Sequence, residues 1–191
     1  MTNRWWVPIG LLTAMVLLGW AVRGAPLPID DWFQGLGSDM GSRRAVFLVF
    51  TKPPLVAAAL VIGVIVALRQ QRKRLALAMV VSPLLGITIV RLVKPVFGRE
   101  KEGALAYPSG HTTFLVTVTG LLMLVACMRL WALAIAVCVV LLGIFGLSMT
   151  FHYFTDTVGG VLLGTSLVCI SAIVVRQGDY GGVRSGPSGL R

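Results

Sequence analysis

The chain contains two histidines, His111 and His152, and each lies in a short polar segment beside a long apolar run. An imidazole side chain acts as a nucleophile or as a proton donor near neutral pH. A lone histidine at a helix end is more often structural or only solvated. Two of them at membrane edges, each spaced regularly from other polar residues, favour a shared catalytic site instead.

His111 ends the segment Tyr107-Pro108-Ser109-Gly110-His111, which comes directly before an apolar run. At the start of a helix the backbone N–H groups of Ser109 and Gly110 have no partner within the helix, and the positive end of the helix dipole favours an anion there. Pro-Ser-Gly is also an ordinary turn and helix cap. Next to a histidine, the segment predicts a phosphate site.

His152 and Asp156 are four residues apart, so a helical backbone places both side chains on one face. A carboxylate in that position holds one imidazole N–H and fixes the tautomer, which leaves the other ring nitrogen as a directed nucleophile. The alternative is that Asp156 only caps the helix that follows, and one carboxylate can fill both roles.

Three cations, Lys94, Arg99 and Lys101, lie within eight residues at the end of an apolar run. Such a cluster would neutralise a phosphate and the charge that builds on it in a transition state. Arg91 lies one turn before Lys94 and can add to the cluster. The alternative is that these side chains only bind anionic lipid headgroups.

The elements that must position these residues are long apolar runs. Hydrophobic residues make up 57% of the 191 residues and charged residues 13%, against about 25% charged in a soluble domain. Each run is close to the roughly 20 residues that cross a bilayer. We therefore expect an all-α integral membrane protein with about six transmembrane helices, the second kinked at Pro53-Pro54. The expected spans are 5–22, 45–68, 75–93, 112–128, 131–151 and 157–175.

The runs form one expected membrane domain, residues 1–176, and the Gly- and Ser-rich residues 177–191 predict a disordered tail. The first run resembles a signal peptide in its positive start, but its apolar part is longer than usual, which favours a retained helix. Between the first two runs, Ile29, Trp32, Phe33 and Leu36 predict a short amphipathic stretch at the membrane interface.

The net charge of +10 reflects basic residues at the ends of the apolar runs, where they face lipid headgroups. Since no basic stripe carries interleaved aromatic residues, we expect no nucleic-acid binding. The charge bias predicts that both termini are cytoplasmic and that both histidines face the outer side. The three cysteines lie inside apolar runs without metal-ligand spacing, and we interpret them as small buried residues: Cys127, Cys138 and Cys169.

The order of these motifs resembles the type 2 phosphatidic acid phosphatase family, whose pattern is K-x6-R-P, then P-S-G-H, then S-R-x5-H-x3-D. The match runs from Lys94 to Gly160. The resemblance implies a six-helix membrane phosphatase that needs no metal and no cofactor. It implies that His152 attacks phosphorus to give a phosphohistidine, that Asp156 orients His152 and that His111 protonates the leaving oxygen. The implied phosphate-binding residues are Lys94, Ser109 and Gly110, with Lys101 and Arg99 beside them.

The chain departs from that pattern twice. Lys101-Glu102 replaces the Arg-Pro of the first motif, which keeps a charge but loses the planar guanidinium. Gly146 stands where the third motif has its arginine, so a charged phosphate contact worth about 2–4 kcal/mol to the transition state is missing there. Either Arg91 and Arg99 compensate, or the activity is weak, altered or lost.

These features predict a lipid phosphatase, because a site at the membrane edge suits a phosphate whose tail stays in the bilayer. We expect a polyprenyl diphosphate first, and phosphatidic acid or phosphatidylglycerol phosphate next, in a prokaryotic inner membrane. One alternative is a non-catalytic relative that binds lipid phosphate or a partner. Another is a small transporter, which is disfavoured because ionisable residues within the runs are few.

Overall fold

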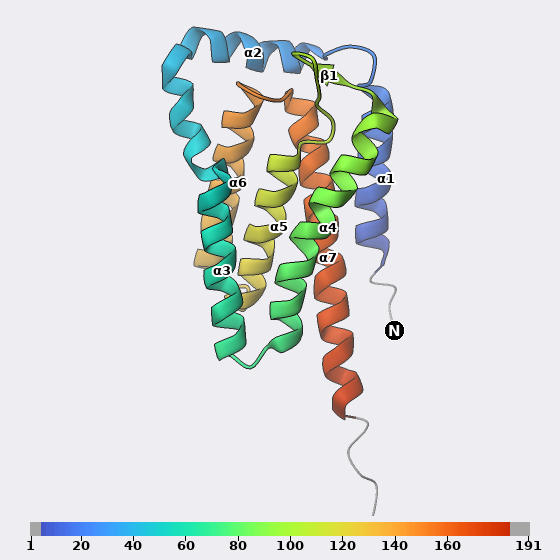
Figure 1. Ribbon diagram of the computed structural model, residues 1–191, viewed down its shortest axis with the longest axis vertical. Helices are drawn as coiled ribbons and strands as arrows, with labels where there is room; N and C mark the ends of the chain where they lie inside the picture. The colour runs from blue at the N-terminus through green and yellow to red at the C-terminus, as the bar shows by residue number, and fades with distance from the viewer. Residues whose placement is uncertain (1–4, 184–191) are drawn as a thin grey trace, which may run out of the picture.

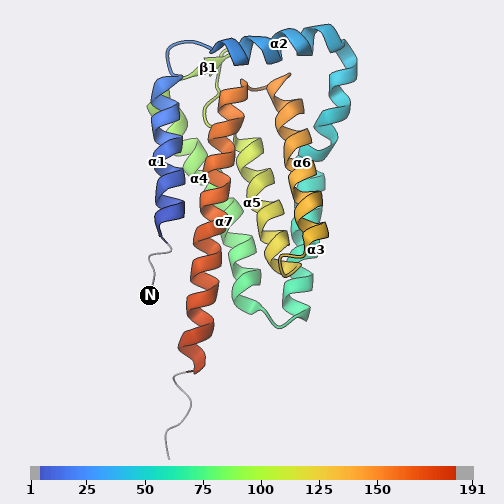
Figure 2. The same ribbon diagram turned by 180° about the vertical axis from the view of Figure 1, so that it is seen from behind.

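The computed structural model describes residues 5–183, which fold into a bundle made almost entirely of helices (Figure 1). Six of the helices run roughly along one axis, and α2 lies across one end of them (Figures 1 and 2). The elements are α1 (Trp6–Ala21), α2 (Pro28–Met40), the 3₁₀ helix η1 (Gly41–Thr51), α3 (Pro53–Arg69), α4 (Lys73–Phe97), β1 (Glu100–Lys101), β2 (Ala104–Leu105), α5 (Gly110–Val125), α6 (Leu130–Ser148) and α7 (Phe154–Val183).

Within residues 5–183, four helical segments are long and apolar enough to cross a membrane, which confirms the predicted all-α membrane fold: Pro28–Arg69, Lys73–Phe97, Leu130–Ser148 and Phe154–Gln177. The first of them combines α2, η1 and α3. The apolar helices α1 and α5 have 16 residues each, a length of about 24 Å against a hydrocarbon thickness of about 30 Å. The bundle therefore joins long spans to two shorter ones.

The expected kink lies at Lys52, which has an extended backbone with φ −60° and ψ 121°. Proline disfavours a helical conformation in the residue before it, and Pro53 and Pro54 offer no backbone N–H to the carbonyls one turn earlier. The sequence predicted one span over residues 45–68 with a kink at these prolines. The chain instead forms η1 before the break and α3 after it, because the two prolines interrupt the α-helical hydrogen bonding at this point.

The segment that carries the basic cluster is more ordered than the loop that the sequence predicted. Gly98 ends α4 in the left-handed conformation, with φ 62°, which glycine adopts without steric cost. The chain then turns into a small antiparallel hairpin in which Glu100 pairs with Leu105 and Lys101 with Ala104. This hairpin brings Arg99 and Lys101 back over the end of the bundle.

The last helix is longer than its predicted end at residue 175. α7 continues to Val183, and residues 176–183 contain no proline that would stop it. Residues 177–183, predicted to belong to a disordered tail, are therefore helical, while residues 184–191 lie outside the described part of the chain. The N-terminal end of α1 and the C-terminal end of α7 both point away from α2 (Figure 1).

Candidate active site

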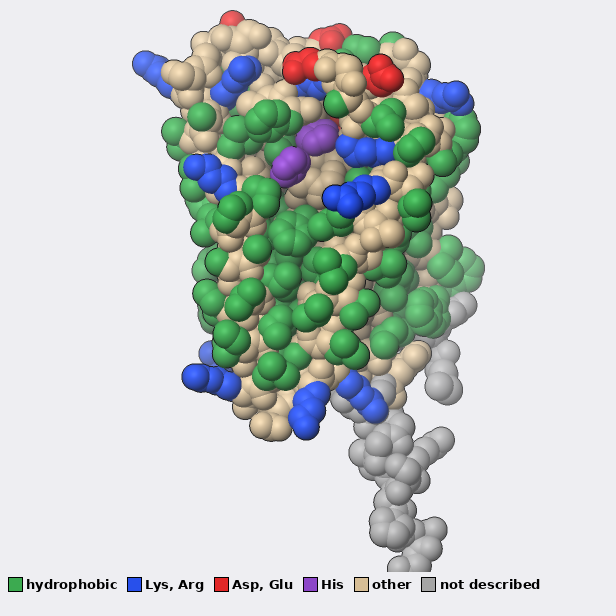
Figure 3. Space-filling view, viewed as in Figure 1, with side chains coloured by type: hydrophobic (Ala, Val, Ile, Leu, Met, Phe, Trp, Pro, Cys, Tyr) green, Lys and Arg blue, Asp and Glu red, His purple; other side chains and the backbone are tan. Residues whose placement is uncertain are grey.

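Both histidines lie at the end of the bundle that α2 covers. His111 is the second residue of α5, and His152 belongs to the loop between α6 and α7. Their ring centroids are 6.0 Å apart and the ring planes are inclined by 59°. In the space-filling view the two histidines lie together on one face, beside basic side chains and above a broad apolar surface (Figure 3). The two motifs thus meet, although 41 positions separate the histidines in the sequence.

His152 faces Asp156, as the four-residue spacing predicted. The two residues do not share a helix, because His152 lies in the loop before α7 and Asp156 in its first turn. Nδ1 of His152 lies 3.9 Å from Oδ2 of Asp156. That oxygen accepts a hydrogen bond of 2.9 Å from the backbone N–H of Tyr153, so Asp156 also stabilises the start of the helix. Nδ1 of His152 and Oδ1 of Asp156 are buried with no hydrogen-bond partner among the described residues. A small movement would bring the imidazole N–H onto the carboxylate.

The surroundings keep His152 neutral. Its side chain is largely buried, and burial together with the nearby positive charge of Lys94 lowers its pKa to about 3. Desolvation and neighbouring cations both disfavour an imidazolium. A neutral ring whose Nδ1 faces a carboxylate has Nε2 free for attack on an electrophile.

Ser109 and Gly110 occupy the start of α5. Ser109 is fully buried and caps the helix, since its Oγ accepts a hydrogen bond of 3.3 Å from the N–H of Thr112. Its own N–H donates to the carbonyl of Asp156 over 3.0 Å, which joins the two motifs directly. Gly110 is the first helical residue, where the backbone N–H has no partner within the helix. At this helix start the N–H of Gly110 is therefore better placed for an anion than that of Ser109.

Lys94 and Lys101 differ in their surroundings. Lys94 is half-buried near the end of α4, and its ammonium group donates to the carbonyl of Leu105. Lys101 is 8% exposed, and Nζ donates to the carbonyls of Thr150 and His152 over 2.6 and 3.3 Å. Burial lowers the pKa of Lys101, and the Glu102 carboxylate raises it. Lys101 thus holds the loop that carries His152, whereas Lys94 lies near both imidazoles.

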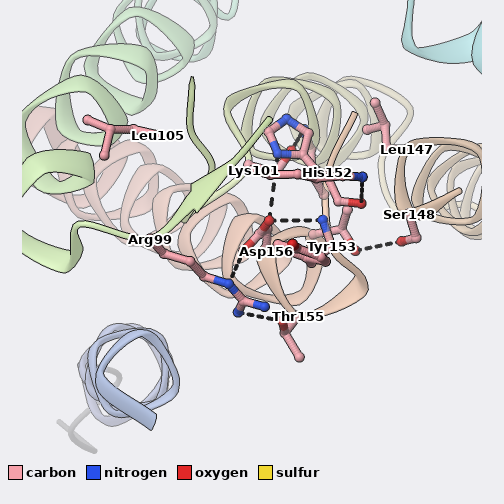
Figure 4. Close-up of polar contacts among 12 residues, drawn as sticks. Arg99, Lys101, Leu105, Leu147, Ser148, His152, Tyr153, Thr155 and Asp156 are labelled. Atoms are coloured by element: carbon pink, nitrogen blue, oxygen red, sulfur yellow. Dashed lines mark hydrogen bonds and ion pairs between the residues drawn. The ribbon is translucent and has the colours of Figure 1, made fainter. Parts of the chain in front are cut away.

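Arg99, which the sequence grouped with the phosphate-binding cations, is engaged with carboxylates. Its NH2 lies 2.8 Å from Oδ2 of Asp30 and its Nε 3.5 Å from Oδ1 of Asp156. NH1 donates to Oγ1 of Thr155 over 2.8 Å, and the guanidinium lies 4.6 Å from the centroid of the Tyr153 ring. Figure 4 shows Asp156 between His152 and Arg99.

α2 contributes two polar residues that sequence reasoning missed. Asp30 is fully buried and accepts from the N–H of Thr155 over 2.9 Å. The amide of Gln34 donates to the carbonyls of Ser148 and His152 and accepts from Lys101. Asp30, Gln34 and the buried Gly37 follow one another at helical spacing, so polar residues on one face of this stretch were the available signal.

The amphipathic stretch itself is oriented differently from the prediction. Trp32 and Ile29 are 58% and 45% exposed, while Phe33 is buried and stacks on Phe154 with ring centroids 4.8 Å apart. The predicted apolar face is therefore divided between the surroundings and the bundle. The buried side of α2 rests on the loop of His152 and on the start of α7.

The place of the missing arginine is filled by another element. A Cβ added to Gly146 would lie 2.8 Å from the backbone carbon and from Cβ of Phe47, which belongs to η1. No real side chain is accommodated at such distances. Nearby, NH1 of Arg44 reaches the carbonyl of Met149 over 3.3 Å. The close approach of η1 to α6 excludes an arginine at position 146.

The arrangement offers a neutral imidazole, a carboxylate behind it, a second imidazole in front of it and an ammonium group beside both. A nucleophile lies about 3–3.5 Å from the atom that it attacks, and an acid about 2.7–2.8 Å from the oxygen that it protonates. Two rings whose centroids lie 6.0 Å apart can both contact one phosphoryl group. No group of three or more potential metal ligands occurs among the described residues.

Comparison with known families agrees with this geometry. The family model described as the PAP2 superfamily matches residues 93–179, which run from the end of α4 into α7 and include both histidines. No match was found among curated proteins or among solved structures.

Proposed function

The chain belongs to the PAP2 superfamily, a membrane family of phosphatases acting on phosphate esters, and on this premise we propose that it hydrolyses a phosphomonoester or diphosphate of a lipid. The observation that carries the proposal is the approach of His111 and His152 to 6.0 Å between ring centroids at one end of the bundle. Only there do a free imidazole nitrogen, a second imidazole and the Lys94 ammonium group converge in the described part of the chain.

The reaction proceeds in two steps. Nε2 of His152 attacks phosphorus and forms an N–P bond while the bond to the leaving oxygen breaks, and His111 gives its proton to that oxygen. Lys94 and the N–H of Gly110 stabilise the charge on the phosphoryl oxygens. Water, deprotonated by His111, then attacks the phosphohistidine and releases phosphate. Asp156 stabilises the positive charge on His152 in the first step.

An apolar groove supports a lipid substrate over a soluble one. It has a volume of about 650 Å³ and is lined by residues of α3, α5 and α6. Leu115, Val118 and Leu122 line it and follow His111 along one face of α5, at four, seven and eleven residues' distance. A phosphate at His111 thus stands above apolar surface that suits a hydrocarbon tail.

Among lipid phosphates we favour a polyprenyl diphosphate, followed by phosphatidic acid and phosphatidylglycerol phosphate, since no soluble insertion interrupts the chain to recognise a large headgroup. The distribution of basic residues supports a cytoplasmic position for both termini and an active site on the outer side of a prokaryotic inner membrane.

The test is phosphate release in detergent with EDTA from prenyl diphosphates and glycerolipid phosphates, with His152→Ala alongside. We expect release without added metal and its loss in the variant. Release by His152→Ala would exclude His152 as nucleophile. No release from any substrate would favour a non-catalytic lipid-phosphate-binding protein, which the absence of an arginine at position 146 makes the second candidate.

A further inference from the structure

Arg99 connects three elements that are far apart in the sequence. It follows α4, and its guanidinium contacts Asp30 of α2 and both Thr155 and Asp156 at the start of α7. Arg99 is 4% exposed, and both carboxylates are fully buried. A buried guanidinium between two buried carboxylates is held in place, because moving it would leave charges without a partner.

The two oxygens of Asp156 face in different directions. Oδ2 faces Nδ1 of His152 at 3.9 Å and accepts from the N–H of Tyr153, whereas Oδ1 lies 3.5 Å from Nε of Arg99. Arg99 therefore approaches the carboxylate from the side opposite the nucleophile (Figure 4). The rotation of the carboxylate depends on this cation, and with it the position of the oxygen that meets the imidazole.

The same contacts separate Arg99 from the phosphate. Its NH1 and NH2 are engaged with Thr155 and Asp30, and the Tyr153 ring lies along its guanidinium. Lys94 carries none of these contacts and lies beside both imidazoles. Lys94 and Arg99 thus have different tasks, one toward the substrate and one toward Asp156.

We propose that Arg99, held by Asp30 of α2, is a positioning residue that orients the Asp156 carboxylate and through it fixes the tautomer of His152. The proposal rests on the proposed function for its kinetic consequence only. Arg99 is hydrogen-bonded to Asp30 and forms an ion pair with Asp156, which in turn faces His152, so this chain of polar contacts connects α2 to the proposed nucleophile.

The kinetic test compares Arg99→Lys with Arg43→Gln, an exposed arginine on η1. Lysine keeps the charge but cannot contact Asp30, Thr155 and Asp156 together. We expect kcat to fall by about tenfold or more with KM changed by less than about twofold, and no further loss when Arg99→Lys is added to Asp156→Asn. A rise in KM with unchanged kcat, or additive losses, would overturn the proposal.

A second measurement does not need activity. In the His111→Asn background His152 is the only histidine, so ¹⁵N-histidine labelling of a protein purified without a histidine tag reports its tautomer alone. We expect Arg99→Lys to change the ratio of the two tautomers and Arg43→Gln to leave it unchanged. Identical spectra for all three proteins would refute the proposal, even if the protein hydrolysed no lipid phosphate.

Should Arg99→Lys fail to fold, Asp30→Asn tests the same chain from its other end. It removes the charge that holds the guanidinium while retaining an oxygen for the N–H of Thr155. We expect a tautomer change in the same direction, and an unchanged His152 spectrum would overturn the proposal.

Discussion

At the scale of residues, His152, the proposed nucleophile, is set apart by its protonation state. Burial first and Lys94 second lower the pKa of His152 to about 3. An ordinary imidazole, with a pKa of 6.5, is mostly protonated at pH 5. In the neutral ring Nδ1 can carry the N–H that faces Asp156 while Nε2 stays unprotonated for attack.

We predict that His152 remains neutral at pH 5. In ¹⁵N-labelled His111→Asn protein, its ring nitrogens should show the shifts of neutral imidazole from pH 8 down to pH 5. Because the unfolded chain takes up this proton near pH 6.5 and the folded chain does not, His152 contributes a loss of stability as the pH drops below 6.5, whereas Asp156, whose pKa burial raises to about 6, contributes in the opposite direction. A titration of His152 centred near pH 6.5 in the folded protein would contradict the prediction.

A second prediction concerns the missing arginine. Gly146→Arg restores the family residue but should not raise activity, since Phe47 fills the place of its side chain. Even Gly146→Ala should destabilise the protein by about 1–3 kcal/mol through overpacking. Unfolding in detergent measures this, with Gly10→Ala as the control, because a Cβ at Gly10 meets nothing within 4 Å. Higher phosphatase activity of Gly146→Arg would show that η1 moves aside.

The candidate residues could be predicted from the sequence where they stand a few positions apart in a short motif. His111, His152 and Asp156 stand in short motifs, and the resemblance to the family assigned them the roles of acid, nucleophile and orienting carboxylate. The role of Asp30 could not be predicted, because a lone aspartate in a polar stretch is usually exposed and its partner Arg99 lies 69 positions away. Pairing between distant segments leaves no local pattern.

At the scale of elements, the helices that cross the membrane could be predicted from their apolar runs, and the break at Lys52 from two prolines. The orientation of α2 could not, since its exposed Trp32 and its buried Phe33 are equally apolar. The 3₁₀ helix η1 could not be predicted from the sequence for a related reason. Its departure from α-helical geometry depends on how it packs against α6, which position 146 permits by having no side chain.

α2 covers the loop of His152, and Gly37 lies against that loop without room for a side chain. A Cβ there would lie 2.3 Å from the carbonyl oxygen of Met149, a backbone atom that cannot turn aside. We predict that Gly37→Ala moves α2 away from the loop and lowers both kcat and the unfolding temperature. Gly35→Ala, on the same helix with nothing within 4 Å, should be neutral or slightly stabilising. Equal behaviour of the two variants would show that α2 does not position the loop.

At the scale of the whole molecule, the candidate catalytic residues and the basic connection between α3 and α4 lie at opposite ends of the bundle. Both histidines, the hairpin and α2 lie at one end, and the α3–α4 and α5–α6 connections lie at the other (Figure 1). The α3–α4 connection and the helix ends beside it carry four basic residues, Arg69, Arg72, Lys73 and Arg74. A membrane protein retains such basic connections on the cytoplasmic side. We therefore propose that this charge difference orients the bundle with the α3–α4 connection in the cytoplasm.

This orientation gives the last prediction. Asp39, exposed on α2, and Cys127, exposed in the α5–α6 connection, lie at opposite ends of the bundle. In intact bacterial cells a membrane-impermeant maleimide should label Asp39→Cys, prepared with the three native cysteines replaced, and should leave protein with Cys127 as its only cysteine unlabelled until the cells are opened. Asp39 lies on the exposed side of α2, away from the imidazoles. Hydrolysis should therefore persist in the Asp39→Cys protein, which would show that this variant folds correctly. Labelling of Cys127 alone in intact cells would place His111 and His152 in the cytoplasm, where they would meet lipid phosphates of the inner leaflet instead.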